Sequence, residues 1–123
     1  MNRLLALFIL LSGLLVGNLA LADFQKGIVA HNKGDYATAF REWTPLAEQG
    51  DVRAQYNLGQ MYKNGQGVTQ NYKTAIRWFK LSAEQGNTSA QFNLGVMYTK
   101  GQGVSIIPEE PLGRVKQGIL AVF

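Results

Sequence analysis

The feature that most constrains this chain is an internal repeat with a period of 36 residues. Residues 54–62 read AQYNLGQMY, and residues 90–98 read AQFNLGVMY. The same offset carries the AEQG at 47–50 onto the AEQG at 83–86. A unit of this length is too short for a domain and suits one helical hairpin. The repeat therefore predicts an all-α array of about two and a half helix-turn-helix units.

Residues that commonly cap the N-termini of helices recur at the same place in each unit, namely Asp35, Asp51, Asn71 and Asn87. The helices that they predict cover residues 36–49, 52–63, 72–85 and 88–99. Gly50 and Gly86 follow two of them, where a left-handed residue closes the last turn. Each unit is therefore expected to hold two helices joined by a short turn.

Two loops contain a Gly-x-Gly sequence, KNGQGV at 63–68 and KGQGV at 100–104. A dinucleotide-binding loop would need a third glycine three residues after the second, and it would follow a strand. Gln70 and Ile106 occupy those positions, and the preceding segments are predicted helices. We interpret the loops as joints, in which Gly65 takes the left-handed conformation that ends a helix.

These spacings resemble the Sel1-like repeat, a relative of the tetratricopeptide repeat. The second unit matches at Ala54, Leu58, Gly59, Tyr62, Gly65, Gly67, Val68, Ala75, Phe79, Ala83 and Gly86. The third unit matches only in its first half, at Ala90, Leu94, Gly95, Tyr98, Gly101, Gly103 and Val104. The resemblance implies a short right-handed α-solenoid that binds another protein or a peptide. It does not choose among adaptor, scaffold, inhibitor and envelope-regulation roles.

The first 22 residues are typical of a signal peptide. A positive start at Arg3 precedes an apolar run over 4–16, and Ala20 and Ala22 form a small-x-small cleavage pattern. We expect cleavage after Ala22, with the product periplasmic or secreted and not stably inserted in a membrane. A retained anchor is the rival interpretation, although the apolar run is shorter than the ~20 residues of a membrane span.

The repeat domain is expected to cover residues 23–104, and residues 105–123 break its pattern. A third complete unit would have a cap, a tyrosine and an alanine at positions that hold Ile107, Pro108 and Pro111. The last segment is either a rebuilt capping helix, which Pro111 could start, or the disordered end of a truncated array. Two and a half units bury little surface, so self-association also remains open.

Composition argues against catalysis and against nucleic-acid binding. The chain has no cysteine and a single histidine, His31, which excludes thiolate metal sites and disfavours others. Of its 12 basic residues Arg3 lies in the leader, so the remainder carries 11 basic and 8 acidic residues, a scattered net charge of +3. We expect no enzymatic activity, no metal and no cofactor. A β-lactam-directed hydrolase, suggested by cysteine-rich relatives, is a weak alternative.

A comparison of the two copies of the first helix separates a repeated side from a variable side. Residues 54, 55, 57, 58, 59, 61 and 62 are identical to their counterparts, whereas 52, 53, 56, 60, 63 and 64 differ. The repeated side should pack against neighbouring helices, and the variable side should line the concave surface. The predicted partner-binding residues are therefore Arg53, Tyr56, Gln60, Lys63, Ser89, Phe92, Val96 and Thr99.

Trp78 is a further candidate for partner binding, because its counterpart in the preceding unit is Glu42 and it therefore lies outside the repeated packing pattern. An alternative function uses Trp78 together with Tyr56 and Phe92 to bind a cell-wall peptide or glycan. Both functions remain open from the sequence.

Overall fold

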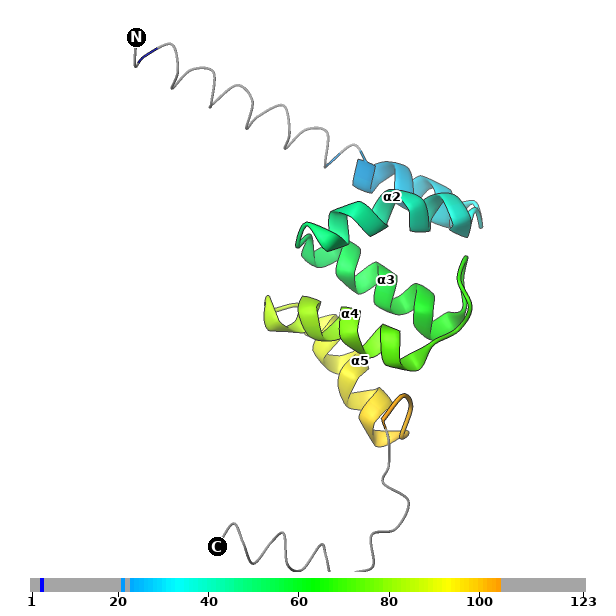
Figure 1. Ribbon diagram of the computed structural model, residues 1–123, viewed down its shortest axis with the longest axis vertical. Helices are drawn as coiled ribbons and strands as arrows, with labels where there is room; N and C mark the ends of the chain where they lie inside the picture. The colour runs from blue at the N-terminus through cyan, green and yellow to red at the C-terminus, as the bar shows by residue number, and fades with distance from the viewer. Residues whose placement is uncertain (1–2, 4–20, 22, 105–123) are drawn as a thin grey trace, which may run out of the picture.

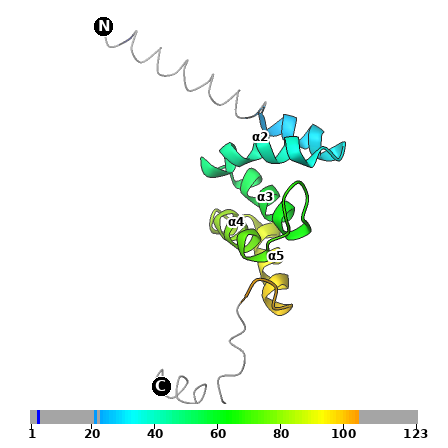
Figure 2. The same ribbon diagram turned by 45° about the vertical axis from the view of Figure 1, so that its right-hand side comes forward.

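The computed structural model describes residues 3, 21 and 23–104, and these residues form helices and turns without any strand. A first helical segment covers 23–32, and it is followed by α2 (Tyr36–Glu48), α3 (Val52–Asn64), α4 (Tyr72–Glu84) and α5 (Thr88–Thr99). Figures 1 and 2 show these helices stacked in chain order from one end of the array to the other. The predicted short all-α solenoid is confirmed. The predicted leader and the segment 105–123 lie outside the described residues, apart from Arg3 and Leu21.

The four predicted N-terminal caps all act as caps. Asp35 accepts a hydrogen bond from the Thr38 N–H at 3.2 Å, and Asp51 accepts from two backbone N–H groups. Asn71 and Asn87 do the same for α4 and α5, with oxygen–nitrogen distances of 3.0 and 2.9 Å. The helix boundaries differ from the predicted ones by one residue at most.

The Gly-x-Gly loops are structural joints. Gly65 closes α3 at φ 67°, and its N–H donates to the Met61 carbonyl. The backbone of Gly67 lies against the start of α2, where an added Cβ would meet the Tyr36 carbonyl oxygen at 2.8 Å. Gly103 lies in the same way against Tyr72 at the start of α4. Each loop therefore turns the chain and also packs against the hairpin that precedes it.

Two close contacts between helices place an aromatic ring on a glycine. A Cβ at Gly27 would overlap the ring of Trp43, and a Cβ at Gly59 would lie 2.6 Å from the ring of Phe79. Trp43 and Phe79 are almost fully buried and belong to the two hydrophobic clusters of the array. Gly27 and Gly59 are 32 residues apart because the first loop is four residues shorter than the second.

Polar contacts hold α3 and α4 in an antiparallel hairpin. The Ser82 hydroxyl, near the end of α4, donates to the Val52 carbonyl at the start of α3. One turn beyond Ser82, the Gln85 amide donates to the Gly50 carbonyl and to Gln55 Oε1. These side chains satisfy polar groups that packing would otherwise leave without water.

We predict that the same glycine-to-alanine change has opposite effects in two repeats. Gly59→Ala should lower the free energy of unfolding by about 1–3 kcal/mol, because the new methyl group meets the buried Phe79 ring. Gly95, 36 residues later, has open space around its Cβ position. Gly95→Ala should therefore raise that free energy by about 0.5–1 kcal/mol through helix propensity.

Urea denaturation of dilute protein, followed by tryptophan fluorescence, measures both changes. Equal shifts for the two variants would show that the Gly59–Phe79 contact does not control the distance between the helices.

Candidate functional site

A hollow of about 250 Å³ lies between the first helix and α3. Its lining combines aromatic and uncharged polar side chains, which are Ile28, His31, Trp43, Tyr56, Asn57, Gln60, Asn64 and Gln66. The first helix supplies Ile28 and His31, α2 supplies Trp43, and α3 and its loop supply the rest. The lining contains no Asp, Glu, Lys or Arg.

The aromatic side of this hollow is fixed in place. The Trp43 indole N–H donates to the Phe24 carbonyl at 3.1 Å, and the His31 ring lies 5.7 Å from the Trp43 ring. Tyr56 lies 5.8 Å from the ring of Phe79, and its hydroxyl accepts a hydrogen bond from Gln60 at 3.0 Å. The hollow therefore has rigid walls before any ligand enters.

The opposite side offers hydrogen-bonding groups. Within residues 23–104, the side chains of Asn57, Asn64 and Gln66 make no hydrogen bond to another residue. Each of these amides can both donate and accept, which is what an extended peptide backbone requires. This side of the hollow thus presents both hydrogen-bond donors and acceptors to a ligand.

The predicted partner-binding residues lie on more than one surface. Tyr56 and Gln60 line the hollow. Arg53 lies 4.0 Å over the Phe24 ring and pairs with Asp51, while the Lys63 ammonium donates to Asn93 Oδ1 at 2.9 Å. Arg53 and Lys63 therefore tie α3 to its neighbours instead of lining the hollow.

The predicted residues of α5 lie elsewhere. Phe92, Val96 and Thr99 line a second hollow, of about 460 Å³, together with Gly95 and Lys100. Ser89 is exposed and does not line it.

Trp78 lines a third hollow with Tyr62, Thr74, Arg77 and Leu81. Tyr56, Phe92 and Trp78, the three aromatics considered for glycan binding, therefore belong to three separate hollows.

Sequence reasoning missed six residues of the first hollow, which are Ile28, His31, Trp43, Asn57, Asn64 and Gln66. The repetition of Asn57 as Asn93 predicts a packing role, yet Asn57 also borders the hollow. The 36-residue offset does not align the first helix with α3, so it does not indicate which residues of the first helix vary. An offset of 32 does align them, and it places Ile28 opposite Gln60.

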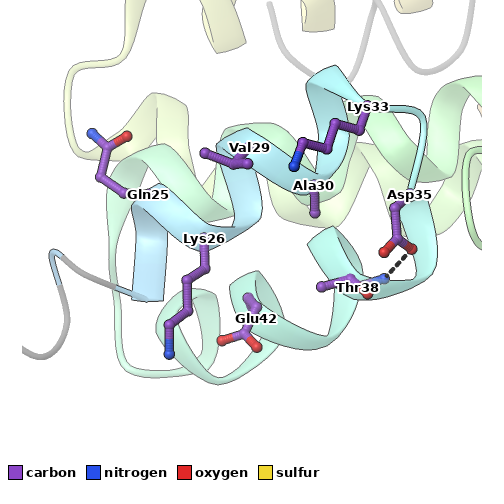
Figure 3. Close-up of a pocket in the computed structure, with 8 residues that line it drawn as sticks. All are labelled: Gln25, Lys26, Val29, Ala30, Lys33, Asp35, Thr38 and Glu42. Atoms are coloured by element: carbon purple, nitrogen blue, oxygen red, sulfur yellow. Dashed lines mark hydrogen bonds between the residues drawn. The ribbon is translucent and has the colours of Figure 1, made fainter.

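A larger hollow of about 600 Å³ lies between the first helix and α2 (Figure 3). Its charged side chains are Lys26, Lys33, Asp35 and Glu42. At an offset of 32, Lys26 and Val29 correspond to Leu58 and Met61, which α2 buries completely. This surface is polar where the next unit is apolar, as in a repeat that ends an array.

Asp51 carries the main electrostatic feature near α3. Burial raises its pKa, but hydrogen bonds from the Arg53 side chain and from the Arg53 and Ala54 N–H groups outweigh that effect. The pKa of Asp51 is therefore lowered from 3.8, and the pKa of Arg53 is raised by the same hydrogen bond. The carboxylate thus stabilises the fold when it is ionised.

Within the residues that the structure describes, no group of three or more His, Asp or Glu side chains could hold a metal ion. None of the described helices is long and apolar enough to cross a bilayer.

Comparison with known proteins identifies the repeats. The Sel1 repeat family matches residues 52–87 and 88–106. The chain is a Sel1-repeat protein. It is similar to the Sel1 repeat protein from Oxalobacter formigenes, with 35% identity and a TM-score of 0.62 over 67% of this chain and 34% of that one. A comparison with curated proteins finds no match.

The Sel1-repeat protein is also similar to c5321, a protective antigen of uropathogenic Escherichia coli strains that displays an SLR fold. The identity is 40% and the TM-score 0.65, over 71% of this chain and 20% of that one. The chain thus spans about a third of the first structure and a fifth of the second. Sel1 repeats typically serve as protein–protein interaction modules, and their fold is generally a non-catalytic scaffold.

We predict that Asp51 stabilises α3 mainly as a cap and partly through its charge. Asp51→Ala should lower the free energy of unfolding by about 1 kcal/mol at neutral pH. Asp51→Asn should cost less, because asparagine caps α4 and α5 in the same way. The advantage of the wild type over Asp51→Asn should shrink as the pH falls through 3.8, where the unfolded chain takes up a proton. It should disappear once the pH is below the lowered pKa of the folded state, where the folded carboxylate is protonated as well.

Urea midpoints at neutral pH and near pH 3 test this order. A gap between wild type and Asp51→Asn that stays constant with pH would exclude the charge contribution.

Proposed function

We propose that this Sel1-repeat protein is exported and binds an extended peptide segment of another protein in the hollow between the first helix and α3. The observation that carries the proposal is the pairing of rigid aromatic walls with three amide side chains that have no partner within residues 23–104. Export is supported by the signal-peptide pattern of residues 1–22. By binding that protein, this chain would act as an adaptor or an inhibitor.

Hydrogen bonding is expected to dominate recognition in this hollow. Asn57, Asn64 and Gln66 can pair with main-chain N–H and C=O groups, while Tyr56, which is half-buried, offers apolar surface to a side chain. Because the lining contains no Asp, Glu, Lys or Arg, binding should depend only weakly on salt.

A peptide suits this site better than a glycan. Sugar rings stack on aromatic faces that lie close together, and Tyr56, Phe92 and Trp78 line different hollows. The only aromatic residues of the peptide site are His31, Trp43 and Tyr56, and Trp43 is 2% exposed.

We predict that two arginines placed in the hollow abolish partner capture. Gln60→Arg/Asn64→Arg fills the hollow with charge and removes two side-chain amides, so affinity for the native partner should fall at least about tenfold. A photo-crosslinking amino acid at Asn64 should give adducts with a specific envelope protein. In a separate pull-down, the wild type should capture that protein and the arginine pair should not.

The matched control is Gln25→Arg/Asn32→Arg, which makes the same chemical changes at exposed positions of the first helix. It should capture the partner as well as the wild type does. Equal capture by all three proteins, with unchanged circular dichroism, would refute the peptide site.

A further inference from the structure

One side of α5 carries a stripe of exposed residues. Thr88, Phe92, Gly95 and Thr99 are all exposed, and at 100° per residue they fall within a sector of about 60°. Phe92 has 72% of its surface exposed, the largest exposed fraction among the large hydrophobic residues of the described chain. The stripe lies on the side opposite Ala90 and Met97, which are fully buried.

The stripe is uncharged, with two threonines flanking an aromatic residue and a glycine. None of the twelve residues of α5 is Asp, Glu, Lys, Arg or His. The Thr99 hydroxyl donates to the Gly95 carbonyl at 2.8 Å, so it needs no water to satisfy it. The stripe itself can therefore be buried without removing a charged group of α5 from water, although Lys100, just beyond the helix, borders the same hollow.

The molecule already shows how such a stripe is covered. On α3 the corresponding residues are Val52, Tyr56, Gly59 and Lys63, and α4 packs over the first three of them as an antiparallel helix. Phe79 of α4 lies on Gly59, with its ring 5.8 Å from that of Tyr56. A stripe of this kind is thus covered, on α3, by an antiparallel helix that places an aromatic residue over the glycine. Over Gly95 no described residue comes within 4 Å of a Cβ.

The stripe of α5 is complementary to itself. Thr88 and Thr99 lie equally far from the midpoint between Asn93 and Leu94, and so do Phe92 and Gly95. If two copies of α5 pair antiparallel about that midpoint, Phe92 of each copy meets Gly95 of the other and threonine meets threonine. We infer that the partner of this surface is a second copy of the chain, bound as a two-fold symmetric dimer through α5.

Electrostatics favour this occupant. The uncharged stripes do not repel each other, and antiparallel pairing sets the helix dipoles in opposite directions. The other end of the array carries Lys26, Lys33 and Glu42 in its hollow, so head-to-tail stacking on α5 would bury charges. The interface therefore closes after two copies.

Residues 105–123 do not repeat the sequence of α4. At an offset of 36, they have Val115 where α4 has Phe79 and Pro111 where α4 has the fully buried Ala75. They offer no aromatic residue for Gly95 at that register, whereas Phe92 of a second copy does. A single pair of helices falls below the ~1,200 Å² of a stable interface, so the dimer should be concentration-dependent.

Exchange of the aromatic residue and the glycine tests the pairing. In sedimentation velocity of the full chain, purified as the cell processes it, the wild type should pass from monomer to dimer with increasing concentration. Phe92→Gly and Gly95→Phe should each raise the dimer Kd at least about tenfold. The double variant Phe92→Gly/Gly95→Phe should restore dimerisation, because each Phe again meets a Gly. Leu81→Gly, which removes an exposed apolar residue from α4, should leave Kd unchanged.

Cysteine crosslinking tests the antiparallel direction, since the chain has no cysteine of its own. Thr88→Cys/Thr99→Cys should form disulfide-linked dimers, while each single variant alone should not. The two positions are about 16 Å apart within one helix, too far for an internal disulfide. A mixture of the two single variants should crosslink.

A wild type that stays monomeric at all concentrations would overturn the proposal. If deletion of residues 105–123 then produced the dimer, that segment would be the occupant of the stripe instead. A dimer that survives Phe92→Gly and Gly95→Phe would likewise overturn the assigned surface. Neither result bears on the hollow between the first helix and α3 (the peptide hollow), which the substitutions at Gln60 and Asn64 test.

Discussion

The contact of an aromatic ring with a glycine on the facing helix is the interaction on which the rest of this array depends. Trp43 on Gly27 and Phe79 on Gly59 bring helix axes close enough for the backbone of one helix to support the ring of the other. Loss of such a buried ring typically costs about 3–5 kcal/mol. In a chain without cysteine, two contacts of this kind are comparable to the net stability of a typical domain, about 5–15 kcal/mol.

The close approach of the helices also builds the candidate site. Because Trp43 reaches Gly27, its indole N–H can bond to the Phe24 carbonyl, and its ring forms one wall of the peptide hollow. Because Phe79 reaches Gly59, Tyr56 is held against it and can accept a hydrogen bond from Gln60. The two packing contacts thus position the aromatic residues that a peptide would meet.

The helices, their caps and their joints could be predicted from the sequence, because each depends on local chemistry that the repeat displays twice. Asp51 and Asn87 cap equivalent helices, and Gly65 needs only its left-handed φ. The division of the predicted groove into separate surfaces could not be predicted. A comparison of α3 with α5 reveals which residues vary, but it does not reveal that Arg53 contacts Phe24 or that Lys63 bonds to Asn93.

Equivalent positions of the repeat therefore have different roles, because the residues around them differ. Tyr56 and Phe92 occupy the same repeat position, yet Tyr56 is half-buried between α4 and the peptide hollow, and Phe92 is exposed. Gly59 and Gly95 differ in the same way. In the second unit the ring and the glycine are both covered by one helix of the same chain. On α5 no described residue covers Phe92 and Gly95. Because these two residues lie symmetrically on the stripe, Phe92 of a second copy could pack on Gly95 of the first.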